Sequence, residues 1–299
     1  MKQLIEEIDR TTAAMDAVRS DLGEGHPRYA AQLGRLGVLY HQAGKPRDAL
    51  SLLRKALEVQ RENQLEQTTD YAVLLNNTAV TCRELGRPEE ARRLFLEALE
   101  LDRAAAGDTT PQYATHLNNL AGLHQQLGQF DQALPLMVQV IEIDRETLGD
   151  RHPQYATHLN NLAVLHLQLG QPRSALPLMK KALEIGEKTL GTDHPKYATR
   201  LNNMALAFCY LGHPKEARTR LERALAISGQ ALGEDHIEFA IMVLNMACLH
   251  RGLRQIDRAL QLAQDAHTSL MRSLGRTHAH AEAAWKFLQS LKRAARRRH

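Results

Sequence analysis

The chain has 299 residues, of which 43% are hydrophobic and only 4% aromatic, so its core must consist of small and medium aliphatic side chains, as in helical proteins. The formal net charge is +4, but six cations and no acid lie in residues 285–299, which leaves residues 1–284 with a net charge of −2. This balance excludes a basic nucleic-acid-binding body, and we interpret the basic end as a solvated terminus, with binding to an anionic partner as the alternative.

The beginning of the chain does not have the pattern of an export signal. Residues 1–16, MKQLIEEIDRTTAAMD, contain acids where a signal peptide has an apolar run, and no apolar stretch reaches the ~20 residues that cross a bilayer. Cys82, Cys209 and Cys248 have no C-x-x-C spacing and are expected to be reduced core or groove residues. We therefore predict a cytoplasmic protein without a membrane partner.

The first predicted element is a helix over residues 2–22, and a repeat with a period of 42 residues follows it over residues 26–275. Three sets of residues share this period: the aromatics Tyr29, Tyr71, Tyr113, Tyr155, Tyr197 and Phe239; the alanines Ala49, Ala91, Ala133, Ala175, Ala217 and Ala259; and the glycines Gly44, Gly86, Gly128, Gly170 and Gly212. Such self-similarity is the signature of a repeat architecture. Six repeats are predicted, beginning near residues 26, 68, 110, 152, 194 and 236.

Each repeat contains two amphipathic helices, which we call helix A and helix B. In the fifth repeat, helix A has apolar residues at Leu201, Met204, Ala205, Phe208 and Leu211, a helical spacing. Gly212 and Pro214 then predict the end of helix A and the start of helix B. The recurrent alanine is expected where the two helices cross closely, because only a small side chain lets the backbones approach.

The ends of the chain fit the same register. Residues 2–22 align with a helix B, and residues 278–295 align with a helix A that places Trp285 at the position of Leu33, Leu75, Leu117, Leu159, Leu201 and Val243. Both are predicted to be capping helices, which shield the open faces of a solenoid. Residues 296–299 are predicted to be a basic tail, and residues 1–299 a single domain.

The recurrent glycine, alanine and leucine positions resemble the tetratricopeptide repeat (TPR). More specifically, HPQYATHLNNLAVLHLQLGQPRSALPLMKKALEIGEKTLGTDHP (residues 152–195) is similar to the 42-residue repeats of kinesin light chains and their bacterial relatives. The resemblance implies an all-α, right-handed superhelical solenoid of helix–turn–helix repeats that acts as a protein-binding adaptor and not as an enzyme. The heptad-rich coiled coil of true kinesin light chains is missing, which argues against a motor-cargo role.

Helix A carries a column of asparagines that we call the asparagine ladder: Asn76, Asn77, Asn118, Asn119, Asn160, Asn161, Asn202, Asn203 and Asn245. Each asparagine in a helix interior costs ~0.5 kcal/mol or more relative to alanine, so some compensating role is expected. An amide side chain can both donate to and accept from a peptide backbone. Ligand binding is one interpretation, which the family resemblance also implies, and inheritance by repeat duplication is the other. The first repeat has Gly34 and Arg35 at these positions.

Further positions on helix A are expected to set the specificity of the predicted concave groove. They include Arg35, Arg83, Gln125, Leu167 and Arg251. We predict a protein or peptide ligand in extended form, and the resemblance implies that this ligand is acidic with an aromatic anchor. No cofactor is predicted.

The fifteen histidines do not predict a metal site, because equivalent residues of a solenoid move apart from repeat to repeat. No catalytic constellation and no phosphate-binding loop is found, so we predict a protein that is not an enzyme. Two further functions stay open: a regulatory sensor that clasps a separately encoded protease or NTPase, and an assembly scaffold that stacks through its caps. A monomer is the predicted oligomeric state for the adaptor.

Overall fold

The computed structural model describes residues 2–276 and 278–296, in which all regular secondary structure is α-helical. Residues 297–299 of the predicted basic tail lie outside the described residues. Contacts divide the chain into two compact units, Met1–Leu148 and Gly149–His299, which we call the first and second units and describe separately. The predicted single domain stays a prediction.

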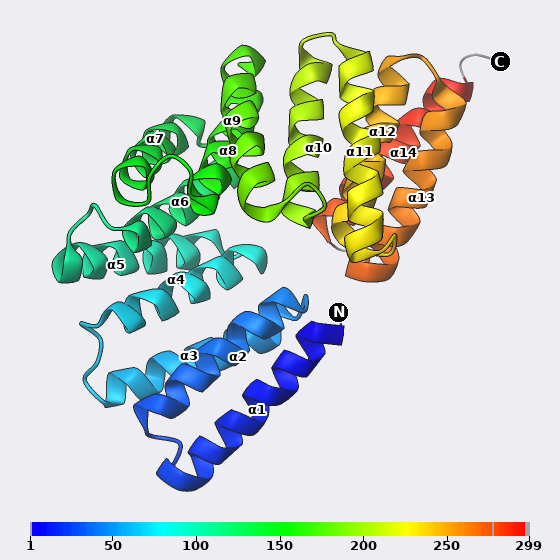
Figure 1. Ribbon diagram of the computed structural model, residues 1–299. Coiled ribbons are helices and arrows are strands. Elements are labelled where there is room, and N and C mark those ends of the chain that lie inside the picture. The colour runs from blue at the N-terminus through cyan, green and yellow to red at the C-terminus, as the bar shows by residue number, and fades with distance from the viewer. Residues whose placement is uncertain (1, 277, 297–299) are drawn as a thin grey trace. The chain divides into compact units, whose positions relative to one another are not determined.

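The first unit contains one helix, which packs against the first of the three helix pairs that follow it (Figure 1). Its helices are α1 (Lys2–Leu22), α2 (Pro27–Gln42), α3 (Pro46–Glu62), α4 (Thr69–Glu84), α5 (Pro88–Ala106), α6 (Pro111–Gln126) and α7 (Phe130–Thr147). Helix A and helix B of each repeat, such as α4 and α5, pack against each other, and each helix B also contacts the next helix A within the unit.

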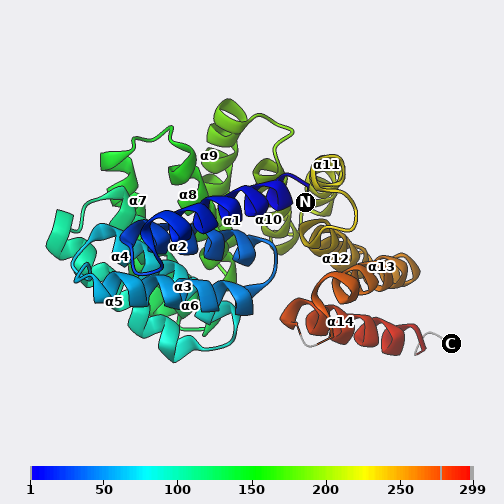
Figure 2. The ribbon, with the colours of Figure 1, turned by 90° about the horizontal axis from the view of Figure 1, so that it is seen from below.

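The second unit contains three helix pairs followed by a last helix. Its helices are α8 (Pro153–Gln168), α9 (Pro172–Leu190), α10 (Pro195–Tyr210), α11 (Pro214–Leu232), α12 (Ile237–Gly252), α13 (Ile256–Leu274) and α14 (Ala279–Arg296). Figure 2 shows α12, α13 and α14 side by side in chain order. The prediction of an all-helical chain built from consecutive helix pairs is confirmed.

The helix boundaries have local causes that the sequence signals. Each helix A begins after a capping residue: a histidine Nδ1 or a threonine Oγ1 accepts a hydrogen bond from a backbone N–H of the first turn, as His152 does from Gln154 at 3.2 Å and Thr110 from Tyr113 at 3.1 Å. After helix A of the fifth repeat, Gly212 adopts φ = 76°, a conformation that glycine reaches without strain. Pro214 then occupies the first turn of α11, where its missing N–H has no intrahelical acceptor to lose.

The recurrent alanine lies where helices A and B cross. All six alanines at this position are fully buried, with a relative exposure of 0%. In the first repeat, a Cβ added to Gly37 of α2 would lie 2.7 Å from Cγ of Leu53 and 3.3 Å from the carbonyl oxygen of Ala49, so the two backbones approach closely there. The prediction that this position requires a small side chain follows from that packing.

A buried pair of ionisable side chains joins two repeats in the first unit. His116 of α6 and Asp102 of α5 have side chains only 3% and 2% exposed, and Nδ1 of His116 lies 2.6 Å from Oδ2 of Asp102. Gln112 donates a hydrogen bond of 2.7 Å to the other carboxylate oxygen. Where α3 meets α4 in the preceding repeats, the equivalent residues are Gln60 and Leu74, and both are buried. The same packing position therefore also accepts a neutral pair.

The last helix differs from the other helices A in the burial of one face. Trp285 aligns with core leucines, yet its side chain is 48% exposed, and α14 is instead buried through Ala281, Ala284, Leu288 and Leu291. On the aligned face of α2, Gly37 lies against Leu53 of α3 and Gly34 lies against Leu74 of α4, whereas no described helix follows α14. Polar Glu282, Lys286 and Gln289 stand on this face where α2 has Ala30, Gly34 and Gly37, as expected for a solvated cap.

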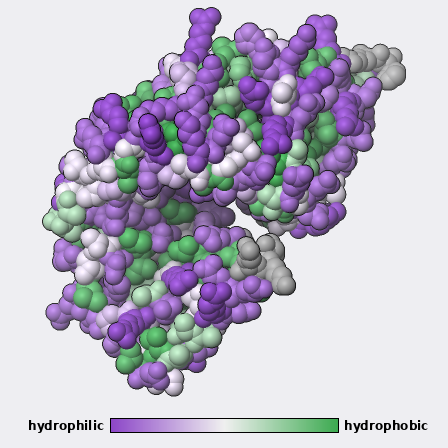
Figure 3. Space-filling view, in the orientation of Figure 1, coloured by the Kyte–Doolittle hydropathy of each residue, from purple (hydrophilic) through white to green (hydrophobic). Residues whose placement is uncertain are grey.

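The surface is mainly hydrophilic, with small separate hydrophobic patches, on the face shown in Figure 3. The large exposed apolar side chains, such as Leu96, Val138 and Tyr210, come from different helices. Among the described residues, no helix has the length and apolar character needed to cross a membrane.

Candidate functional site

The two asparagines of each pair have different surroundings. The first asparagine is buried in three repeats, where Asn76, Asn160 and Asn202 are 5%, 8% and 5% exposed. The second asparagine, Asn77, Asn119, Asn161 or Asn203, is half-buried, as are Asn118 and the lone Asn245. Neighbouring residues of a helix differ by about 100° in direction, so only one member of a pair can face open surface fully.

The asparagines bond to one another between repeats. Asn119 donates a hydrogen bond of 2.9 Å to Oδ1 of Asn76 in the first unit. In the second unit, Asn203 donates to Asn160 at 3.2 Å and Asn245 donates to Asn202 at 2.8 Å. The asparagine of one helix A thus satisfies the buried amide of the preceding helix A. This structural role was missed at the sequence level, because it depends on how adjacent repeats are placed.

Asn77 differs from the other second asparagines. Gly34 occupies the equivalent of the buried asparagine in the preceding repeat and offers no side chain. The side-chain oxygen of Asn77 accepts a hydrogen bond of 3.4 Å from the side chain of Asn76, in the same helix. Asn77 can therefore be changed without loss of a bond between repeats.

This difference predicts unequal effects of two alanine substitutions on stability. Asn119→Ala is expected to lower the free energy of unfolding by about 1 kcal/mol, because the buried Asn76 loses its partner. Asn77→Ala is expected to leave stability nearly unchanged, because the loss of the long bond from Asn76 is offset by the higher helix propensity of alanine. Urea denaturation followed by circular dichroism measures both, and equal losses would contradict the assigned bonds.

The three arginines predicted to set the specificity of the groove have separate neighbours. Arg35 pairs with Glu7 of α1 at 3.0 Å. The half-buried Arg83 reaches toward α6, where its Nη1 lies 3.4 Å from the carbonyl oxygen of Asn119, and burial lowers the pKa of its guanidinium. Arg251 is exposed and lies over the ring of Phe287 at 4.8 Å. No shared arginine cluster is formed by Arg35 and Arg83 within the first unit.

The two remaining predicted specificity residues also differ from each other. Leu167 is 6% exposed and belongs to the hydrophobic core of the second unit, with Ala163 and Ala175. Its apolar side chain packs α8 against α9 and leaves little surface for a ligand, and its role as a ligand contact stays a prediction. Gln125 is half-buried and stays a candidate.

Several histidines cap helices or contact glutamine side chains, and the cysteines differ in burial. His26, His152, His194 and His236 cap the first turns of helices, and Nδ1 of His124, His166 and His250 lies 2.6–2.8 Å from the side-chain oxygen of a glutamine five residues later. Cys82 is buried, Cys248 is half-buried and Cys209 is exposed. Burial raises the pKa of Cys82 to about 11, which keeps its thiol protonated at neutral pH.

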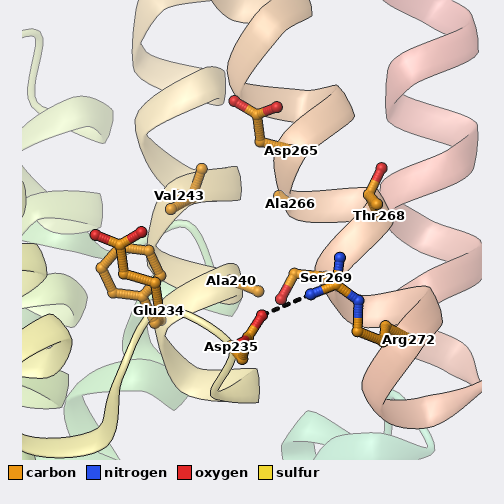
Figure 4. A pocket seen from close by; sticks show the side chains of 10 residues that line it. Glu234, Asp235, Ala240, Val243, Asp265, Ala266, Thr268, Ser269 and Arg272 are labelled. Carbon is orange, nitrogen blue, oxygen red and sulfur yellow. Dashed lines mark hydrogen bonds and ion pairs between the residues drawn. The ribbon is translucent and has the colours of Figure 1, made fainter.

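Two cavities open between helices of the second unit. One, of about 290 Å³, lies between α12 and α13 and is shown in Figure 4. Its lining includes the acids Glu234, Asp235 and Asp265, and Arg272 donates a hydrogen bond of 2.7 Å to Asp235. The other cavity, of about 490 Å³, lies between α9 and α11 over α10 and has a different, basic lining.

The chain was compared with known proteins by sequence and by structure. The tetratricopeptide repeat profile matches residues 11–62, 70–146, 112–188 and 174–230. No curated protein sequence matches the chain at a significant level. The chain is similar to the crystal structure of a putative kinesin light chain from Podospora anserina, with 25% identity and a TM-score of 0.56 over 69% of this chain and 98% of the other.

Two further solved structures share the fold. BtubC from P. vanneervenii is 22% identical, with a TM-score of 0.60 over 77% of this chain and 92% of its own. RapI in its apo form is 15% identical, with a TM-score of 0.68 over 92% and 94% of the two chains. Tetratricopeptide repeats mediate protein–protein interaction and scaffolding, and proteins built from them are typically non-enzymatic adaptors. The chain belongs to the tetratricopeptide repeat family, and its 42-residue repeats are of the kinesin-light-chain-like kind.

Proposed function

We propose that the chain is an adaptor that binds an extended peptide segment of a partner protein along the asparagine ladder. The observation that carries this proposal is the row of half-buried second asparagines, which keep part of each amide available. Asn119 and Asn245 use a side-chain N–H in the bond to the preceding repeat, and among the residues that the structure describes no partner bonds to their side-chain oxygens. Such an oxygen can accept a hydrogen bond from a ligand's backbone N–H.

The bonds between repeats also favour binding. They hold the amides in one orientation before the ligand arrives, so less side-chain freedom is lost on binding. The ladder thus has a structural role that does not exclude ligand contact. Both interpretations of the asparagines are combined in this proposal.

The chemistry of the ligand is proposed from the flanking charges and from the family resemblance. Arg83 and Arg251 belong to different units, and an acidic segment could pair with either of them. An aromatic residue in the ligand is suggested by the kinesin-light-chain-like repeats alone. The polar residues that cover the open face of α14 support a monomer.

The proposal is tested by selection from a random peptide library displayed on phage. The immobilised wild-type chain is expected to enrich peptides that the folded Asn119→Ala/Asn203→Ala variant retains poorly. A matched variant, Ala104→Ser/Ala105→Ser on the exposed end of α5, controls for two surface substitutions and should retain the same peptides. Equal enrichment on wild type and asparagine variant would argue against binding by the ladder.

A further inference from the structure

The larger cavity of the second unit has an apolar and aromatic floor. Tyr197, Leu201, Met204 and Phe208, all on α10, form this floor, while Lys180 of α9 and Arg220 of α11 stand at its sides. We call this site the α9–α11 pocket. Its volume of about 490 Å³ is ample for one large side chain of a ligand.

Arg220 breaks a strict pattern of the repeats. The other five repeats have leucine at this position: Leu52, Leu94, Leu136, Leu178 and Leu262. Arg220 is half-buried, so it loses the apolar packing that leucine makes at this position in the other repeats. Residues that depart from the repeat pattern in this way are expected at functional sites. The guanidinium lies over the ring of Phe208 at 5.8 Å, so both residues belong to one arrangement.

Phe208 and Tyr197 make the floor aromatic. The other repeats have Tyr40, Cys82, His124, His166 and His250 where the fifth has Phe208. In the first unit, Arg61 and Arg103 donate hydrogen bonds of 3.0 and 2.7 Å to the hydroxyl groups of Tyr71 and Tyr113. On α9, Glu187 occupies the position that is equivalent to these arginines. The ring of Tyr197 is half-buried, whereas Tyr71 and Tyr113 are buried.

The sides of the pocket carry positive charge that the chain itself does not neutralise. Arg223 pairs with Asp193 at 3.1 Å. Lys180 and Arg220 have no ion-pair partner among the residues that the structure describes, and Glu184 is the acid in the lining. Carboxylates of a ligand would therefore meet two available cations next to an apolar floor.

We infer that the α9–α11 pocket is a second docking site, which binds an acidic segment of a partner protein through one large apolar side chain of that segment. The apolar side chain lies on Phe208 and Tyr197, and neighbouring carboxylates pair with Arg220 and Lys180. This site is independent of the proposed ladder. Leu201 and Asn203 of α10 differ by about 200° in direction, so the floor and the ladder lie on opposite sides of the helix.

The leucine column supplies a variant that removes the site without endangering the fold. Arg220→Leu restores the residue of the five other repeats and is expected to fold at least as stably as wild type. The probe is a short fluorescein-labelled peptide with one phenylalanine among glutamates, measured by fluorescence anisotropy. We expect saturable binding to wild type and a loss of about ten-fold or more in affinity with Arg220→Leu.

Two controls assign the binding to this pocket. Lys215→Leu removes one exposed cation from the first turn of the same helix and should leave affinity unchanged. Replacing the phenylalanine of the probe by serine should abolish binding. The inference is overturned if Arg220→Leu binds the probe as wild type does, if the serine probe binds equally well, or if a labelled single-stranded RNA competes fully with the peptide.

Discussion

Replacement of His116 by leucine is expected to lower the free energy of unfolding by about 3–5 kcal/mol, because it leaves the buried carboxylate of Asp102 without its imidazole partner. The contact between Nδ1 and Oδ2 is 2.6 Å, and both side chains are almost fully removed from solvent. Gln112 would still donate to Asp102, but one neutral hydrogen bond does not compensate a buried charge. Urea denaturation measures the loss.

The equivalent contact between α3 and α4 provides a matched control. The double variant Asp102→Gln/His116→Leu copies the buried pair Gln60 and Leu74 and should recover stability to within about 1 kcal/mol of wild type. If the double variant is as unstable as His116→Leu, the loss arises from packing and not from the unpaired charge.

The same pair makes stability depend on pH. Burial lowers the pKa of His116, and this effect outweighs the nearby Asp102 carboxylate, which raises it. The unfolded chain therefore binds this proton more readily, so the contribution of neutral His116 is complete above the unfolded pKa of about 6.5 and is lost as the pH falls below it. Between about pH 8 and about pH 5, wild type should lose more stability than the double variant.

The second large effect is expected at the crossings of helices A and B. Ala133→Leu and Ala175→Leu should each lower the free energy of unfolding by about 1–3 kcal/mol, because a larger side chain forces the two backbones apart. Both alanines are fully buried, in α7 and α9. Differential scanning calorimetry measures the shift in melting temperature.

The matched control is Ala105→Leu, the same substitution at an exposed position near the end of α5. Alanine and leucine both favour helix, so this variant should melt close to wild type. Unchanged melting for Ala133→Leu and Ala175→Leu would show that the crossings are not tightly packed.

The periodic features of the chain could be predicted from the sequence because each of them has a local cause. The helix pairs follow from apolar spacing, and the starts and ends of helices follow from the capping residues, prolines and glycines of each turn. The burial of the six alanines follows from their place in every pair. Because the repeat recurs six times, the same local argument predicts the helices of every repeat.

The contacts between repeats could not be predicted in the same way. The bond from Asn119 to Asn76 spans 43 residues and depends on the rotation of one helix A relative to the next. For the same reason the packing of Leu167 in the core could not be predicted from its position in the repeat. Trp285 aligns with buried leucines, but alignment does not reveal whether a neighbouring helix covers it.

Two signals in the sequence pointed to residues that the first interpretation missed. Asp102 is an acid on the buried side of a helix B, and its recurrence 42 residues later as Asp144 matches the recurrence of His116 as His158. Arg220 stands in a column of five leucines. Departures from a repeat pattern are as informative as the pattern itself.

The most direct test of the proposed adaptor function is the affinity of a library-selected peptide for Asn77→Ala, measured by isothermal titration calorimetry. This substitution removes an amide from the ladder without breaking a bond between repeats, so stability and binding are separated. The account predicts an unchanged melting temperature and an affinity reduced by about ten-fold, which corresponds to about 1.4 kcal/mol. An unchanged affinity, with Asn119→Ala also binding as wild type does, would contradict it.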